Sequence, residues 1–176
     1  MRFTATALPG VEIVDLERHE DGRGWFARSW CAREFAARGL EAVVAQANLS
    51  YTRRAGTVRG MHFQSWPAEE AKVVRCLTGA MHDVVVDLRP ESPAFRRWVA
   101  IELDGKTHRG VYIPPGCAHG FQTLVDDTEV LYLMSEFHDP AAAGGVRYDD
   151  PALAIQWPLQ VTEVSDKDRA WPLLPA

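Results

Sequence analysis

Short apolar runs separated by turn residues recur along most of this 176-residue chain and constrain its fold more than any other feature. Glycine, proline and aspartate cluster between the runs, where they favour tight turns. The strands expected after residue 40 are 43–50, a run ending at His62, 72–77, 81–88, 98–103, 110–113, 120–125 and 129–135. Many short strands at such spacing are typical of an antiparallel sandwich or barrel. The sequence therefore predicts an all-β fold.

The N-terminal forty residues predict few other elements. Residues 11–14 form an early strand, residues 19–24 (HEDGRG) a turn, and residues 25–30 an extended segment. Residues 31–38 (CAREFAAR) have the composition and spacing of a short helix that ends at Gly39. This is the only helix expected before residue 140.

Two further features concern connections and domain count. Residues 78–80 (TGA), between the runs 72–77 and 81–88, predict a hairpin. The proline-containing tail from residue 141 predicts loops with one helical turn. Because 176 residues are too few for two ordinary domains, we expect a single domain over residues 1–176.

Composition excludes several classes of protein. A net charge of −5 argues against a nucleic-acid-binding surface. No apolar run approaches the roughly 20 residues that a membrane helix needs, and the N-terminus has no apolar region like that of a secretory signal. Three widely spaced cysteines indicate reduced thiols rather than a disulfide framework, and Cys117 is a weak candidate nucleophile. We expect a cytoplasmic protein with neither a membrane nor a nucleic-acid partner.

One motif narrows the all-β class. Residues 114–119 (PPGCAH) supply the Pro-x-Gly-x-x-His half-motif of the cupin jelly roll. A metal-binding cupin would pair it with His-x-His followed by Glu, but residues 62–64 read His-Phe-Gln. The possible donors are His62, Gln64, Glu69 or Glu70, and His119. A neutral glutamine is a weak ligand, so we expect no metal and no other cofactor.

Three side chains suit proton transfer next to a ketone. His62 can serve as a base near neutral pH, and the Lys72 ammonium can stabilise an enolate oxygen. The Tyr132 phenol, protonated at pH 7, can return the proton from the other face. Asp83 and Asp168 are candidate carboxylates to orient the imidazole. The competing interpretation is that His62 is simply a hydrogen-bonded barrel histidine.

Strand parity tests whether these groups share a pocket. Arg59 and His62 are three residues apart, so a regular strand would place them on opposite faces unless Gly60 forms a bulge. Lys72 and Tyr132 each alternate with apolar residues on an inward face. We therefore expect the run 56–72 and the run 111–132 to face each other across one pocket.

Several motifs in one order resemble the dTDP-4-dehydrorhamnose 3,5-epimerase family, over nearly the whole chain. The matching motifs are Asp21-Gly22-Arg23-Gly24, Gln46-x-Asn48-x-Ser50, residues 56–64 (GTVRGMHFQ), Lys72, Val86-Asp87-Leu88-Arg89 with Ser92-Pro93, Pro114-x-Gly116-x-Ala118-His119-Gly120-Phe121, Tyr132, Asp149-Asp150-Pro151-x-Leu153-x-Ile155-x-Trp157-Pro158 and Ser165-x-Lys167-Asp168. The resemblance implies a cupin-type jelly roll, without a metal, in homodimers whose N-terminal strands pair with the neighbour's sheet.

The resemblance also implies a role for each matching side chain. His62 is the proton acceptor with Asp168 as its carboxylate partner, Tyr132 is the acid, and Lys72 holds the ketone oxygen. The substrate-binding residues implied are Arg23 and Arg59 for the diphosphate, with Gln46, Asn48, His119 and Lys167. The substrate implied is a nucleotide-diphosphate 4-keto-6-deoxy sugar, inverted at C3, C5 or both.

Four positions depart from the family pattern, which leaves the proton-transfer set intact but alters the nucleotide end. They are Arg28 for an acidic residue that helps to hold the base, Ala47 for another residue, His138 for a base-stacking tyrosine and Ala143 for a glutamate. The reaction class is therefore more firmly indicated than the substrate. The alternatives are a metal-dependent cupin, such as a dioxygenase or sugar isomerase, and a non-catalytic sugar-nucleotide-binding protein.

Overall fold

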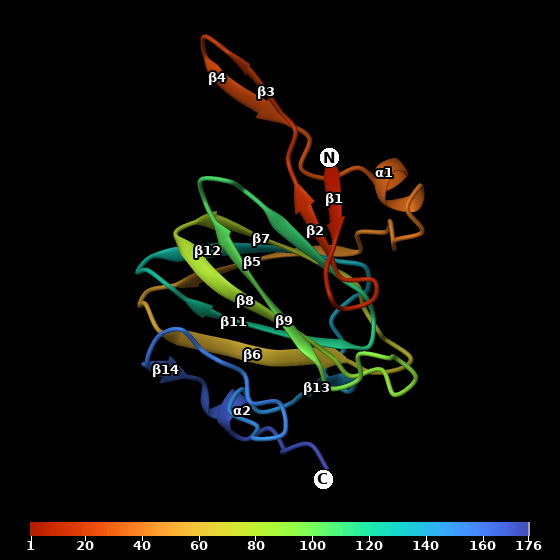
Figure 1. Ribbon diagram of the computed structural model, residues 1–176, viewed down its shortest axis with the longest axis vertical. Helices are drawn as coiled ribbons and strands as arrows, with labels where there is room; N and C mark the ends of the chain where they lie inside the picture. Colours follow the sequence, from red (N-terminus) through yellow and green to blue (C-terminus); the bar gives the residue numbers. More distant parts are fainter. Residues whose placement is uncertain (176) are drawn as a thin grey trace.

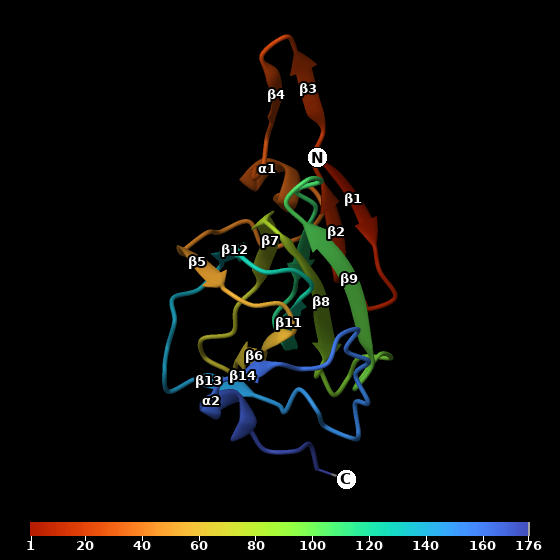
Figure 2. The ribbon, with the colours of Figure 1, turned by 90° about the vertical axis from the view of Figure 1, so that its left-hand side faces the viewer.

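The computed structural model describes residues 1–175 and confirms the all-β prediction. Two antiparallel sheets pack face to face as a sandwich (Figure 1, Figure 2). The first has the strand order β1 (Arg2–Ala5), β2 (Glu12–Asp15), β10 (Gly110–Ile113), β7 (Lys72–Thr78), β12 (Thr128–Met134) and β5 (Gln46–Thr52). The second has the order β13 (Ala143–Gly145), β6 (Thr57–Gln64), β11 (Cys117–Thr123), β8 (Ala80–Asp87) and β9 (Trp98–Asp104), and β14 (Glu163–Val164) pairs in parallel with β6.

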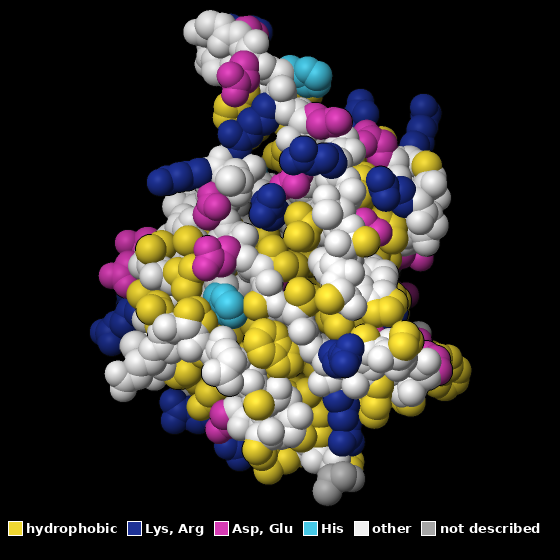
Figure 3. All heavy atoms as spheres, in the orientation of Figure 1, with side chains coloured by type: hydrophobic (Ala, Val, Ile, Leu, Met, Phe, Trp, Pro, Cys, Tyr) yellow, Lys and Arg dark blue, Asp and Glu magenta, His cyan; other side chains and the backbone are white. Residues whose placement is uncertain are grey.

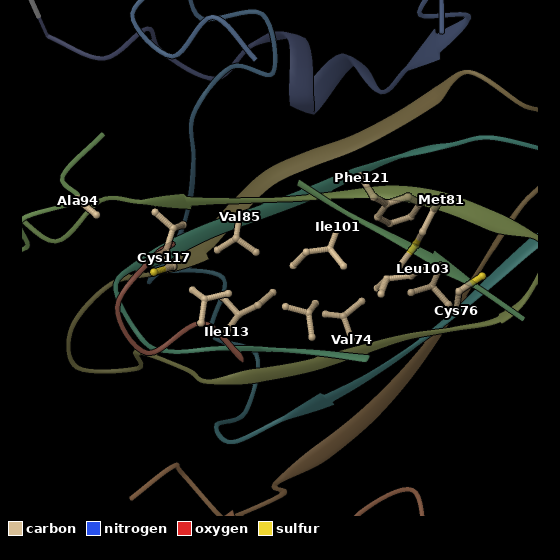
Figure 4. Close-up of a cluster of buried hydrophobic side chains, with 14 residues drawn as sticks. Val74, Cys76, Met81, Val85, Ala94, Ile101, Leu103, Ile113, Cys117 and Phe121 are labelled. Carbon is tan, nitrogen blue, oxygen red and sulfur yellow. The ribbon is translucent and has the colours of Figure 1, made fainter. Parts of the chain in front are cut away.

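Alternating side chains of the two sheets fill the space between them. Val74 and Val130 of the first sheet meet Val85 and Phe121 of the second in a cluster of buried residues (Figure 4). Each of these side chains is at most 1% exposed. The period-two pattern that predicted the strands is therefore the pattern that builds the core.

The outer faces of both sheets are also covered. The short helix α1 (Ala32–Ala36) lies over the first sheet, where Phe35 packs with Tyr112. The C-terminal segment lies over the second sheet, where Leu153 and Ile155 pack against Val84. This segment then adds β14 and the single-turn helix α2 (Asp166–Arg169) beside β6 (Figure 1). Both helices lie where the sequence predicted helical residues.

The predicted hairpin at residues 78–80 is wrong. Strand β7 pairs with β10 and β12 in the first sheet, whereas β8 pairs with β9 and β11 in the second. The chain crosses between the sheets at Gly79, which has a positive φ of 81°. A glycine turn between two strands permits either arrangement, and side-chain packing between the sheets selects the crossing.

Smaller differences concern the ends of strands. Strand β11 begins at Cys117, so His119 lies within a strand and not at the end of a turn. Strand β5 begins only at Gln46, and the strands β13 and β14 lie in the tail that was predicted to be loops. These two strands have only three and two residues, too few for an alternating pattern.

A separate hairpin projects from the sandwich. It consists of β3 (Arg18–Asp21) and β4 (Gly24–Ala27), and it stands clear of both sheets (Figure 1, Figure 2). The turn predicted over residues 19–24 is confined to residues 22–23, because its flanking residues pair as strands. Charged side chains of both signs surround its base, above a face that is mostly apolar or uncharged (Figure 3). Within residues 1–175, no helix is both long enough and apolar enough to span a bilayer.

Candidate active site

A cavity of about 500 Å³ opens between the two sheets. Strands β5, β7 and β12 of the first sheet line one side, and strands β6, β11 and β13 of the second sheet line the other. The C-terminal residues 163–171 close a third side. Its polar and charged lining consists of Asn48, Ser50, Thr57, Arg59, His62, Gln64, Glu70, Lys72, His119, Tyr132, His138, Glu163, Ser165, Lys167, Asp168 and Trp171.

A bulge at Gly60 directs two of these side chains into the cavity. In the pairing of β6 with β11, His62 lies opposite His119 and Arg59 opposite Phe121, so β6 contains one extra residue. Gly60 has φ +136°, and a Cβ there would lie 2.5 Å from the Cα of Gly120. Only glycine fits this conformation and this close approach. The predicted bulge is confirmed.

His62 forms a short contact with a carboxylate. Its Nε2 lies 2.6 Å from Oδ1 of Asp168, and the backbone N–H of Gly60 donates to Oδ2 of the same carboxylate. Burial on its own would raise the pKa of Asp168, but the hydrogen bonds from His62 and Gly60 hold it below its usual value. Asp168 therefore stays ionised at neutral pH and favours a proton on the facing nitrogen of His62.

Tyr132 reaches the cavity from the first sheet. Its hydroxyl lies 3.1 Å from Oγ of Ser50, on the neighbouring strand β5. Burial raises the pKa of the phenol to about 12, although the Ser50 hydrogen bond opposes this shift. The phenol is consequently protonated throughout the neutral range and can act as a proton donor.

Lys72 carries a buried counter-charge. Its Nζ lies 2.9 Å from Oε1 of Glu70 and donates to the backbone carbonyl of His62 at 3.4 Å. The two charged side chains are 8% and 5% exposed. An ammonium this buried needs a carboxylate partner, and its third N–H group is available to an oxygen in the cavity.

The second histidine has a different partner. Nε2 of His119 lies 2.7 Å from Oδ2 of Asp83, and both side chains are buried. Of the two carboxylates considered for His62, Asp83 therefore belongs to His119, and Asp168 contacts His62. His119 remains in the cavity lining, with its ring centroid 6.3 Å from that of Tyr132.

Comparisons with known proteins show which family this chain matches. The family described as dTDP-4-dehydrorhamnose 3,5-epimerase matches residues 5–176. The epimerase of that name from Salmonella typhimurium is 39% identical over 96% of this chain and 93% of its own length. A dTDP-4-dehydrorhamnose 3-epimerase from Streptomyces niveus is 41% identical over 96% of this chain and 82% of its own length. A crystal structure of the 3,5-epimerase from Bacillus anthracis, with TDP and PPi bound, covers 98% of this chain and 99% of its own with a TM-score of 0.94 and 38% identity.

This chain belongs to the dTDP-4-dehydrorhamnose 3,5-epimerase family. It is an isomerase, an epimerase of dTDP-linked 4-keto-6-deoxy sugars with the cupin-type sandwich of that family. The resemblance read from the motifs is confirmed.

Most of the predicted site residues of the epimerase meet in the cavity. His62, Lys72, Tyr132 and Asp168 line it together with Asn48, Arg59, His119, His138 and Lys167. Three others do not line it within this chain. Arg23 pairs with Asp21 at the hairpin tip and is 91% exposed, and Arg28 pairs with Glu34. Gln46 accepts a hydrogen bond from the backbone N–H of His138.

Lining residues without a predicted catalytic or substrate-binding role include Ser50, Glu70 and Trp171. Ser50 contacts Tyr132, Glu70 pairs with Lys72, and Trp171 contacts Asp168. Ser50 alternates with Asn48 on β5, and that spacing was a usable signal. Glu70 was considered only as a metal ligand. Nothing local marks Trp171, which follows α2 and meets the cavity through the path of the tail.

Neither a metal centre nor a cysteine nucleophile is assembled by the epimerase within residues 1–175. No three His, Cys, Asp or Glu side chains there converge as metal ligands. The amide of Gln64, at the position where a metal cupin has its second histidine, instead bonds Ala68, Phe137 and Asp139 of the adjoining loops. Cys117 lies in the core, and burial raises its thiol pKa to about 12.

Proposed function

We propose that this epimerase converts dTDP-4-dehydro-6-deoxyglucose to dTDP-4-dehydrorhamnose by inverting C3 and C5. The observation that carries the proposal is one cavity with an imidazole–carboxylate pair from the second sheet and its tail, and a protonated phenol from the first. Such a pair of groups can take a proton from one side of a sugar ring and return one to the other.

Each inversion proceeds in two proton transfers. His62, whose Nε2 faces Asp168, accepts the proton of the carbon next to the C4 ketone through its other ring nitrogen. The C–H electron pair forms an enolate, and its charge on the ketone oxygen is stabilised by the Lys72 ammonium. Tyr132 then donates its hydroxyl proton to the opposite face of the same carbon, and the ketone re-forms. Before the second inversion, His62 must give up its proton and Tyr132 must take one up, both by exchange with solvent; the same two transfers at the second carbon then complete the 3,5-epimerisation.

Binding uses the rest of the cavity lining. Arg59, Asn48, His119 and Lys167 are proposed to hold the diphosphate and sugar. Because the Arg59 guanidinium is exposed at the cavity and anchored by Thr52 and the Tyr51 carbonyl, it offers a preformed site for phosphate oxygens.

A second copy of the chain is proposed to complete the nucleotide end. The β3–β4 hairpin exposes Phe26 (73%) and Trp25 (43%), and β5 is an edge strand that exposes Leu49 (71%). Unpaired edges and exposed apolar side chains favour association. We propose a homodimer in which the N-terminal strands pair with the neighbour's sheet and bring Arg23 and Arg28 toward its cavity, near Gln46 and His138.

An NMR deuterium-exchange assay tests the proposed reaction. The purified chain is incubated in D₂O with dTDP-, CDP-, GDP- and UDP-linked 4-keto-6-deoxy sugars. We expect deuterium at C3 and C5 of the dTDP sugar, with inversion at both. Exchange at C3 alone would make this chain a 3-epimerase, the activity named for the Streptomyces niveus relative. No exchange with any substrate would overturn the proposal in favour of a non-catalytic binding protein.

We propose that residues 1–176 form one epimerase domain that works in the cytoplasm without a metal or other cofactor, and that its product enters the synthesis of cell-surface polysaccharides or glycosylated metabolites. Three free cysteines support a reducing compartment. Activity that is unchanged after dialysis against EDTA is the expected result, and loss of activity restored by a divalent ion would point to the metal-dependent cupin instead.

A further inference from the structure

Trp171 lines the cavity and has no role in the proposed proton transfers. Its indole Nε1 donates a hydrogen bond to Oδ1 of Asp168 at 3.3 Å. The same oxygen receives the 2.6 Å contact from His62. The indole and imidazole ring centroids are 6.4 Å apart, and both rings line the cavity. Trp171 therefore touches the carboxylate on which the imidazole depends.

The surrounding structure holds the indole in this place. Gly145 of β13 lies opposite His62 in the pairing with β6 and faces the ring. A Cβ at Gly145 would lie 2.5 Å from Nε1 of Trp171, so any larger residue would displace the indole. On the helix side, the Lys167 ammonium lies 5.4 Å from the ring centroid, in cation–π contact.

The two oxygens of Asp168 are anchored differently. Oδ2 accepts a 3.3 Å hydrogen bond from the backbone N–H of Gly60. Within residues 1–175, the donors to Oδ1 are His62 and Trp171. Without the indole N–H, only the imidazole itself would orient Oδ1, and the carboxylate could turn with it.

We propose that Trp171 is a positioning residue that fixes Asp168 and thereby the orientation and protonation of His62. This inference rests on the proposed role of His62 as the proton acceptor. A hydrogen bond to a carboxylate also withdraws part of its charge. Loss of the indole N–H therefore strengthens the hold of Asp168 on a protonated imidazole, and fewer His62 side chains are free to act as a base at a given pH.

The test compares variants that remove the N–H, the whole ring, or neither. Trp171→Phe keeps most of the ring but removes the donor, and Trp171→Ala removes both. Trp157→Phe is the matched control, because its Nε1 donates to the Tyr148 carbonyl outside the cavity. We expect Trp171→Phe to lower kcat by about threefold to tenfold with little change in KM, the loss expected for one hydrogen bond. On the acid side of the pH profile, kcat/KM of this variant should fall at a pH about half a unit higher than in the wild type.

The change in titration should be specific to His62 and should not extend to the other ionisable groups around the cavity. They are Arg59, Glu70, Lys72, Asp83, His119, Tyr132, His138, Glu163 and Lys167. Imidazole N–H resonances in ¹H–¹⁵N NMR of the substrate-free protein separate His62 from His119 and His138. The titration and N–H shift of His62 should change in Trp171→Phe, and those of the other two should not.

A double-mutant cycle with Gly145 gives an independent check. Gly145→Ala should displace the indole and reproduce the acid-side shift of Trp171→Phe. In the Trp171→Ala background the same substitution should cost nothing further, because the space is empty. Additive losses in this cycle, or an unchanged pH profile and unchanged His62 resonances in Trp171→Phe, would overturn the proposal. If the wild type shows no deuterium exchange, the proposed function fails, and the NMR titration still decides whether Trp171 positions His62.

Discussion

The cavity and the projecting hairpin both carry ionisable side chains, but these differ in how far they are buried and held by partners. In the cavity, His62, Lys72 and Tyr132 each have a fixed partner, and the partners of the first two, Asp168 and Glu70, are buried. On the hairpin, Arg23 is 91% exposed and hydrogen-bonds Asp21, two residues away. One chain therefore holds the proposed proton-transfer groups in place, whereas Arg23 on its N-terminal hairpin extends into solvent.

We expect the largest effect from a change in the cavity, at the proposed base His62. His62→Ala should lower deuterium exchange by about 10³-fold, because the base that removes the proton is lost. Binding of dTDP, measured by calorimetry, should be nearly unchanged, since its contacts lie elsewhere in the cavity. Normal turnover in this variant would remove His62 from the role of base.

Tyr132→Phe separates the two faces of the reaction. Inversion should fall by about 10²-fold or more while exchange by His62 continues, because only the returning proton has lost its donor. NMR distinguishes the two outcomes, since deuterium would appear in sugar of unchanged configuration. Wild-type activity should also show no loss from phenol ionisation at neutral pH, because the Tyr132 pKa is raised to about 12. Normal inversion by the variant would mean that another acid acts.

Glu70→Gln tests the buried counter-charge of Lys72. Breaking a buried ion pair typically costs about 3 kcal/mol of unfolding free energy, and a loosely held ammonium should lower kcat by about tenfold. Urea denaturation and steady-state kinetics measure the two effects. Glu69→Gln is the matched control, because the Glu69 side chain is next in sequence to Glu70 but exposed to solvent. Equal behaviour of the two variants would contradict a special role for the pair.

Arg59→Ala addresses the entrance of the cavity. We expect KM to rise about tenfold with little change in kcat, because phosphate contacts are made equally in the ground and transition states. Arg53→Ala, an exposed turn arginine, should leave KM unchanged. An effect on kcat alone would count against a phosphate-binding role.

The smallest effect would reveal whether the hairpin belongs to a neighbour's site. Arg23→Ala should raise KM about threefold, as expected for one exposed charge contact. Mixing this variant with His62→Ala chains under subunit exchange should create sites with both residues intact, and part of the activity at wild-type KM should return. Activity that does not recover, with exchange verified by mass spectrometry, would place Arg23 outside the shared site.

The local pattern of the sequence predicted the all-β architecture, and the order of its motifs, through their resemblance to a known family, indicated the reaction class. Alternation around Val74 and Val130 identified inward strand faces, and the same alternation placed Lys72 and Tyr132 with them. The bulge at Gly60 was predicted because Arg59 and His62, three residues apart, can lie on the same face only if the strand contains one extra residue. Such features depend on neighbours along the chain, which a sequence displays directly.

Contacts between distant segments were decided only by the tertiary structure. The residues by themselves left both Asp83 and Asp168 as candidate partners of His62, with only the family resemblance pointing to Asp168, and they predicted a hairpin where the chain crosses between the sheets at Gly79. It gave no sign that Trp171 would reach Asp168 past Gly145. Each of these outcomes depends on which sheet a strand joins and where the tail returns, and that is settled by packing of the whole core rather than by any local propensity.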